Sequence, residues 1–161
     1  MLQLGSSKGR SVTVTDFQVK IEDSVSDFDG DSPCHGPDAD ILCSDPRGRA
    51  GSYIGGAPDG CECTNVVKNL CSRAYTQTRN WKRGTKVWGN CNRIQQFTAI
   101  ATFPSGSYSG HAAIFDSCTS NGIKVWDQWC GRGKMDSRII RVGNNYHYPS
   151  NAAEAFYTIE V

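Results

Sequence analysis

Residues 60–68 read GCECTNVVK, and this stretch decides the expected fold. Apolar side chains recur with the i, i+3, i+4 and i+7 spacing of one helix face, at Cys63, Val66, Val67 and Leu70. We expect a helix over about residues 60–75, with Cys63 in its first turn. The positive end of the helix dipole lowers the pKa of a thiol in that position, so Cys63 is the candidate nucleophile.

A histidine in a strand-like run complements this cysteine. Residues 110–115 read GHAAIF, which places His111 about fifty residues after Cys63. An imidazole beside a thiol can form an ion pair with it and move the proton during attack on a carbonyl carbon. The two residues together therefore indicate a thiol hydrolase.

A third side chain is expected to hold the imidazole in one tautomer, and Asp127 is the best candidate. It lies on the predicted strand that follows His111. Neighbouring antiparallel strands lie about 4.8 Å apart, which is within reach of a His–Asp hydrogen bond if the register fits. Asn92 and Gln128 are alternatives, because an amide also orients imidazole.

The oxyanion of a tetrahedral intermediate needs hydrogen-bond donors. The backbone N–H of Cys63 at the helix start is the default donor, and Tyr53 and Gln96 are weaker candidates. We expect five further residues to bind substrate: Trp81, Lys82, Arg83, Trp126 and Gln128.

Alternating apolar residues after the helix predict a meander of strands separated by turn signals. The strands are expected at residues 97–103, 110–116, 123–129, 138–142 and 155–161, with a further alternation at 12–21. Residues 76–95 are expected to form a loop. A nucleophile-bearing helix packed on an antiparallel sheet is an α+β layout. We expect an N-terminal extension over residues 1–54 and one domain over residues 55–161.

Charge is distributed unevenly along this chain of 161 residues, whose net charge is +1. Residues 1–62 hold eleven acidic and five basic side chains, whereas residues 63–115 hold seven basic side chains and no acidic one. A basic block attracts anionic polymers, either nucleic acid or an anionic bacterial wall. A solvated basic face explains it equally well. No apolar run is long enough to cross a membrane.

Eight cysteines indicate an oxidising compartment and a fold held by disulfides. Residues 1–7 are too polar for a signal peptide, so we interpret them as the start of the mature part of a secreted protein. A free Cys63 leaves seven cysteines, which cannot all pair, and the alternative is that Cys63 is itself bridged. The local pairs that we expect are Cys118–Cys130, Cys71–Cys91 and Cys34–Cys43. Cys61 is then left over, or it reaches back to the 34–43 region.

Two patterns that could suggest metal binding are weak. Aspartates alternate in residues 27–31, but no glutamate follows at the distance that an EF-hand requires. Cys61 and Cys63 form a C-x-C pair without the matching second pair of a zinc site. We therefore expect no metal and no organic cofactor.

Six blocks of the chain, in the same order, resemble the type VI secretion amidase effectors of family 2. The blocks are residues 60–68, 81–87, 98–103, 110–115, 122–129 and 151–157. The likeness covers about residues 55–161. The extra cysteines and the added N-terminal stretch are similar to the domesticated amidase effectors that ticks and mites acquired by gene transfer and secrete as antibacterial factors.

The resemblance implies a papain-like fold of the NlpC type and peptidoglycan amidase activity. It maps the nucleophile to Cys63, the base to His111 and the third residue to Asp127. It implies cleavage of the cross-link between D-Ala and the diamino acid, diaminopimelate or lysine, of the neighbouring stem. The expected protein is a secreted monomer that acts on bacterial peptidoglycan and not on nucleic acid.

Other functions stay open from the sequence. A non-catalytic wall-binding protein would keep the fold and use the basic block and the tryptophans. An endopeptidase of another effector type would cut the stem between D-Glu and the diamino acid. A disulfide-stapled inhibitor or structural protein would explain the cysteines, but it would not explain the order of Cys63, His111 and Asp127.

Overall fold

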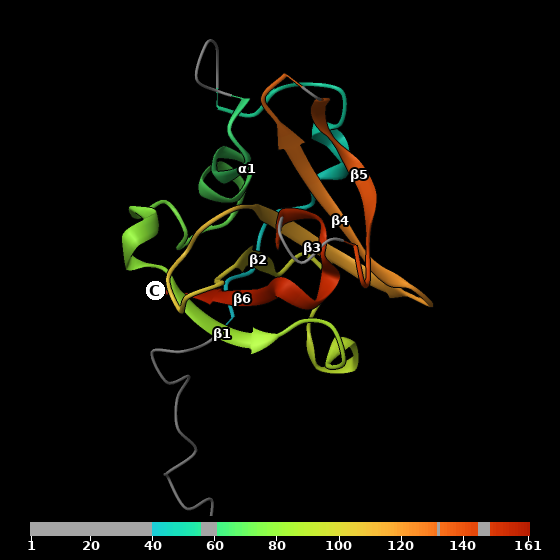
Figure 1. Ribbon diagram of the computed structural model, residues 1–161. Coiled ribbons are helices and arrows are strands. Elements are labelled where there is room, and N and C mark those ends of the chain that lie inside the picture. The colour runs from blue at the N-terminus through green and yellow to red at the C-terminus, as the bar shows by residue number, and fades with distance from the viewer. Residues whose placement is uncertain (1–39, 56–60, 132, 145–148) are drawn as a thin grey trace, which may run out of the picture. The chain divides into compact units, whose positions relative to one another are not determined.

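The computed structural model describes residues 40–55, 61–131, 133–144 and 149–161, which form a helix and a six-stranded sheet (Figure 1). The predicted strand at 12–21 lies outside the described residues. The main elements are α1 (Cys63–Leu70), β1 (Lys82–Lys86), β2 (Ala99–Thr102), β3 (Ala112–Thr119), β4 (Gly122–Trp129), β5 (Gly133–Arg141) and β6 (Phe156–Glu160). The α+β class and the antiparallel sheet are confirmed.

The sheet has the strand order β1-β6-β2-β3-β4-β5, and each neighbouring pair is antiparallel. Every strand predicted in the described part of the chain is present, with shifted ends. β1 lies in the segment that was expected to be a loop. Its sequence, KRGTK, is almost entirely exposed and has no apolar alternation. Pairing with β6 at the sheet edge holds it extended, and a pattern search cannot detect that pairing.

The helix is shorter than the predicted 60–75. It begins at Cys63, and Glu62 before it is already extended, with φ −63° and ψ 138°. It ends at Leu70 because Cys71 is extended and is bonded to Cys43 by a disulfide. The buried residues of α1 are Cys63, Val66 and Val67, which confirms the predicted apolar face.

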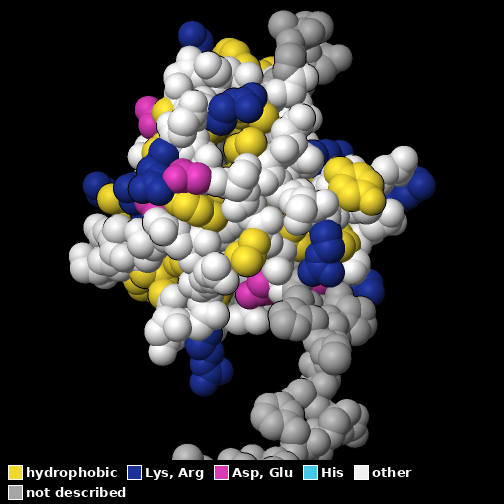
Figure 2. All heavy atoms as spheres, turned by 180° about the vertical axis from the view of Figure 1, so that it is seen from behind, with side chains coloured by type: hydrophobic (Ala, Val, Ile, Leu, Met, Phe, Trp, Pro, Cys, Tyr) yellow, Lys and Arg dark blue, Asp and Glu magenta, His cyan; other side chains and the backbone are white. Residues whose placement is uncertain are grey.

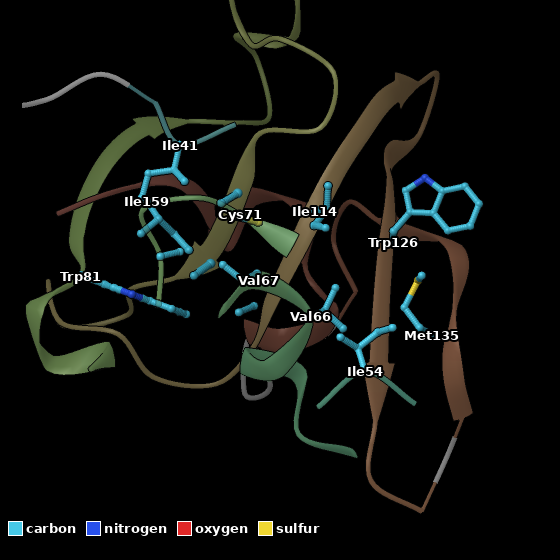
Figure 3. Packing of buried hydrophobic residues seen from close by; sticks show 14 of the residues in the cluster. Ile41, Ile54, Val66, Val67, Cys71, Trp81, Ile114, Trp126, Met135 and Ile159 are labelled. Carbon is cyan, nitrogen blue, oxygen red and sulfur yellow. The ribbon is translucent and has the colours of Figure 1, made fainter. Parts of the chain in front are cut away.

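Apolar side chains cover both faces of the sheet. On the face that α1 covers, Ile54 lies between Val66 of α1 and Met135 of β5 (Figure 3). Ile41 belongs to the same cluster. Residues 40–54, which the sequence assigned to an extension, therefore contribute to the core of the sheet. The opposite face carries a second cluster that includes Ile100, Phe115, Val125, Ile140 and Phe156.

Three disulfides join segments that are distant in sequence: Cys43–Cys71, Cys61–Cys130 and Cys91–Cys118. The predicted pairs Cys118–Cys130, Cys71–Cys91 and Cys34–Cys43 are wrong. Cys118 lies beside the turn between β3 and β4, opposite Ile123, whereas Cys130 follows the far end of β4. At about 3.3 Å per residue along the strand, these two sulfurs cannot meet. Cys34 itself lies outside the described residues.

Candidate active site

Cys63 is the first residue of α1, and its side chain is buried. Among the described cysteines it is the free one. The bridge between Cys61 and Cys130 fastens the chain two residues earlier to the end of β4. The thiol is therefore held at a helix N-terminus, where the dipole favours the thiolate.

His111 lies immediately before β3 and is 1% exposed. Its Nε2 lies 2.6 Å from Oδ2 of Asp127. The imidazole ring stacks on Trp129, with 5.0 Å between centroids and 25° between planes. Because Nε2 is engaged by Asp127, Nδ1 is the ring nitrogen that remains available to the Cys63 thiol.

The two groups shift each other's titration toward an ion pair. Burial raises the pKa of the Cys63 thiol, but the hydrogen bond and the charge of His111 outweigh it, so the pKa lies below that of an ordinary thiol. Burial lowers the pKa of His111, but hydrogen bonds to Asp127 and Cys63 outweigh it, so the pKa lies above that of an ordinary histidine. The arrangement favours a thiolate beside an imidazolium.

Asp127 has a second cationic partner that the sequence did not indicate. Nε of Arg138, on β5, lies 2.7 Å from the Asp127 oxygen that binds His111. Nη1 of Arg138 donates to Oδ1 of Asn151 at 3.1 Å. The guanidinium also lies 5.7 Å from the centre of the Trp129 ring. Only the register between β4 and β5 brings Arg138 to this carboxylate.

Tyr108 is a second residue that the sequence did not indicate. Its hydroxyl oxygen lies 3.7 Å from Sγ of Cys63. Burial, followed by the charge and the hydrogen bond of Cys63, raises the pKa of Tyr108 above that of an ordinary tyrosine, so the phenol keeps its proton. It lies in the loop between β2 and β3, where no periodic pattern distinguishes it.

Gln128, which the sequence offered as a substrate-binding or imidazole-orienting residue, lies beside the segment that precedes Cys63. The side chain is 1% exposed. Its Oε1 accepts the N–H of Ile54 at 2.7 Å, and its Nε2 donates to the carbonyls of Ile54 and Glu62 at 2.9 and 3.0 Å. The amide therefore fixes the chain immediately before Cys63.

The expected substrate-binding tryptophans are also buried, at 3% exposure for Trp81 and 8% for Trp126. Both belong to the apolar cluster that includes Val66 and Val67 of α1, so their side chains contribute to the core. Lys82 and Arg83 are exposed on β1, and the Arg83 guanidinium lies 5.2 Å from the centre of the Tyr157 ring. Figure 2 shows that Lys and Arg side chains are spread over several separate places on the face seen there.

Three candidates remain: Asn92, Gln96 and Tyr53. Asn92 is exposed in a short 3-10 helix, Cys91–Arg93, and Gln96 donates to Oδ1 of Asp116. Tyr53 is 42% exposed. The described residues contain no group of three or more His, Cys, Asp or Glu side chains that could hold a metal ion. None of the described helices is long and apolar enough to cross a membrane.

Comparison with known proteins agrees with this geometry. Residues 36–159 match the family model of domesticated amidase effector 2. The domesticated amidase effector 2 of Ixodes scapularis is 47% identical over 125 residues, which are 75% of this chain and 85% of the relative. The solved structure of a type 6 secretion amidase effector 2 matches with a TM-score of 0.60 at 29% identity, over 74% of this chain and 94% of that one.

Proposed function

Because this chain belongs to the domesticated amidase effector 2 family and is a peptidoglycan amidase, we propose that it hydrolyses peptide cross-links of bacterial walls through the Cys63 thiolate. The proposed bond joins D-Ala to the diamino acid of the neighbouring stem, diaminopimelate or lysine. The observation that carries this proposal is the free, buried thiol at the start of α1, whose pKa is lowered by an imidazole that Asp127 holds at 2.6 Å.

In the acylation step, the thiolate of Cys63 attacks the D-Ala carbonyl carbon. A sulfur–carbon bond forms, and the carbonyl electron pair moves to the oxygen, toward the backbone N–H of Cys63. The pair returns as the carbon–nitrogen bond breaks, and the imidazolium of His111 gives its proton to the departing amine. The first product leaves, and a thioester remains on Cys63.

Deacylation reverses these roles. Neutral His111 takes a proton from water, whose oxygen attacks the thioester carbon. Collapse of the second tetrahedral intermediate expels the thiolate, which is again paired with the imidazolium. Asp127 keeps the ring oriented in both steps and stabilises its positive charge, as the third member of a triad does.

Disulfides persist in oxidising compartments and not in a reducing cell interior, so the three bridges support action outside the cell interior. We infer a secreted antibacterial enzyme with a papain-like, NlpC-type catalytic domain. Residues 40–54 share the core of this domain, so we infer that the domain begins before residue 55, preceded by an N-terminal extension.

Muropeptide analysis tests the proposal. Purified sacculi are incubated with the wild type or with Cys63→Ala, and the released fragments are identified by mass spectrometry. We expect free D-Ala carboxyl ends and free amines on the diamino acid with the wild type, and no products with Cys63→Ala. New ends between D-Glu and the diamino acid would replace the proposed bond by the stem bond. Binding of both proteins without any product would indicate a wall-binding protein.

A further inference from the structure

We propose that the hydroxyl of Tyr108 is a catalytic donor that binds the oxyanion formed when Cys63 attacks the substrate. This role rests on the Cys63 chemistry proposed above. The oxygen of Tyr108 lies 3.7 Å from Sγ of Cys63. In the tetrahedral intermediate, the oxyanion is bonded to the same carbon as the sulfur. A hydroxyl that reaches the sulfur therefore lies near the place where the negative charge develops, and an effective donor approaches that oxygen to about 2.7–3.1 Å.

Two aromatic rings hold the Tyr108 ring in position. Trp81 meets it nearly edge to face, with 5.1 Å between centroids and 72° between planes. Phe103 meets it at 6.5 Å and 78°. Trp81 and Phe103 are both buried, so the phenol is supported from the core. A donor that is already in place requires no reorganisation when the charge forms, and this is what makes such donors effective.

The loop that carries Tyr108 is hydrogen-bonded to Thr102, the last residue of β2. The Thr102 hydroxyl accepts the N–H of His111 at 2.9 Å, and the Thr102 N–H donates to the His111 carbonyl at 3.0 Å. The Ser109 N–H donates to the Thr102 carbonyl at 3.1 Å. Gly110 between them has φ +103°, and a Cβ there would lie 2.7 Å from the Thr102 hydroxyl. Tyr108 and His111 are therefore positioned by one frame.

The protonation state of Tyr108 fits a hydrogen-bond donor rather than an acid. Burial and the neighbouring thiolate raise the pKa of the phenol, so it keeps its proton while the intermediate forms. The bond changes remain those of the acylation step: sulfur–carbon forms, the carbonyl pair moves to oxygen, and the pair returns when carbon–nitrogen breaks. Tyr108 contributes a hydrogen bond to that oxygen, and its O–H bond is never broken.

A different role is available to the same hydroxyl, which is to stabilise the resting thiolate. His111 and the backbone of Ala112 lower the pKa of Cys63 more than the Tyr108 hydroxyl does. Loss of the Tyr108 hydroxyl should therefore change the pKa of Cys63 little and lower kcat strongly. These two measurements separate the two roles.

The test compares Tyr108→Phe, which removes only the hydroxyl, with Tyr75→Phe, whose side chain is 73% exposed. Three quantities are measured on each protein: kcat and KM on a soluble cross-linked muropeptide, the pH dependence of Cys63 alkylation by iodoacetamide, and inhibition by a D-Ala-containing peptide aldehyde. The aldehyde forms a tetrahedral adduct with a thiol and so imitates the intermediate. Melting curves verify that both variants fold.

We expect Tyr108→Phe to lower kcat about 10²-fold, as loss of one oxyanion donor does, with KM nearly unchanged. Inhibition by the aldehyde should weaken by a similar factor, the alkylation profile should stay in place, and Tyr75→Phe should equal the wild type. Wild-type kcat in Tyr108→Phe, or an alkylation profile displaced to higher pH with the kcat loss recovered there, overturns the donor role. Full activity of Cys63→Ala would instead overturn both this role and the proposed function.

Discussion

Arg138 is bonded to the same oxygen of Asp127 that holds His111, because Nε of Arg138 lies 2.7 Å from Oδ2 and Nε2 of His111 lies 2.6 Å from it. A buried carboxylate between two cationic groups is held in one orientation by both. Arg138 is also bonded to Asn151, so it connects β5 to the segment before β6. The orientation of the imidazole therefore depends on strands that lie well beyond the Cys–His pair.

Replacement of Arg138 by Met removes a cation from Asp127 while it keeps much of the side-chain volume. We expect kcat/KM to fall about tenfold, because a carboxylate that is less firmly held positions the imidazole less well. The pKa of His111 should rise further, since Asp127 then directs its whole charge to the imidazolium. The alkaline limb of the kcat/KM profile on a soluble muropeptide should move to higher pH. Arg93→Met, at an exposed position, is the control and should leave the profile unchanged.

Replacement of Asp127 by Asn should move the same limb in the opposite direction. The hydrogen bond and charge of Asp127 raise the pKa of His111, so their loss lowers it, and the imidazolium is lost at a lower pH. We expect kcat/KM to fall about 10²-fold or more, since a triad carboxylate also fixes the tautomer. Limbs that move in the same direction in Asp127→Asn and Arg138→Met would contradict the charge argument.

The disulfides permit a matched comparison. The Cys61–Cys130 bridge begins two residues before the thiol and ends beside Trp129, which stacks on His111. The Cys91–Cys118 bridge instead joins the short 3-10 helix Cys91–Arg93 to the end of β3 near the β3–β4 turn. Each double Cys→Ser variant should lose roughly 2–4 kcal/mol of unfolding free energy. We expect kcat/KM at a temperature where all proteins are folded to fall only when Cys61–Cys130 is removed.

Denaturant unfolding and muropeptide kinetics measure these two effects on the same samples. Equal losses of kcat/KM in both double variants would mean that the Cys61–Cys130 bridge stabilises the fold without positioning the thiol. An unchanged unfolding midpoint in either variant would contradict the pairing that the structure shows.

The cations of β1 are expected to attract the wall. Arg83 and Lys86 border a cavity of about 420 Å³ together with Phe103 and Tyr157, and no ion pair among the described residues involves either cation. We expect binding of the inactive Cys63→Ala protein to sacculi to fall as ionic strength rises, since exposed charges are screened over about 8 Å at physiological salt.

Charge reversal tests whether these cations act locally. The double replacement Lys82→Glu and Arg83→Glu should weaken sacculus binding as high salt does. Hydrolysis of a small soluble muropeptide should change little. Glu at Arg49 and Arg141, two exposed positions elsewhere, gives the same change in net charge and is the control. Equal loss of binding in both pairs would assign the effect to net charge alone, and no loss in either would make β1 a solvated face.

Much of this fold could be predicted because its signals are local. Runs of apolar residues between turn signals mark the inner strands, and the i, i+3, i+4 spacing marks the buried face of α1. β1 carries no such signal, since its exposed side chains follow no alternation and only pairing with β6 holds it. The disulfide partners depend on which strand ends meet in space, and spacing along the chain led to the wrong pairs.

The candidate site follows the same division. Cys63, His111 and Asp127 carry chemistry in their residue types and lie in patterned elements, so the sequence indicates them. Arg138 and Tyr108 reach the site through strand register and through the path of a loop, neither of which leaves a pattern. Tryptophan and glutamine are also common in substrate sites, and the sequence cannot show that Trp81, Trp126 and Gln128 are buried.

The hydrogen bonds between Thr102 and the residues Ser109 and His111 determine where the loop between β2 and β3 tolerates changes in sequence. A Cβ at position 110 would lie 2.7 Å from the Thr102 hydroxyl. Ser109 and His111 at one end of the loop are bonded to Thr102 at the other end, so the base of the loop is fixed. That tip, residues 104–107, is exposed. Exposed loop tips are where insertions are tolerated. A peptide epitope or a fluorescent reporter could therefore be grafted at 104–107 without displacing the imidazole.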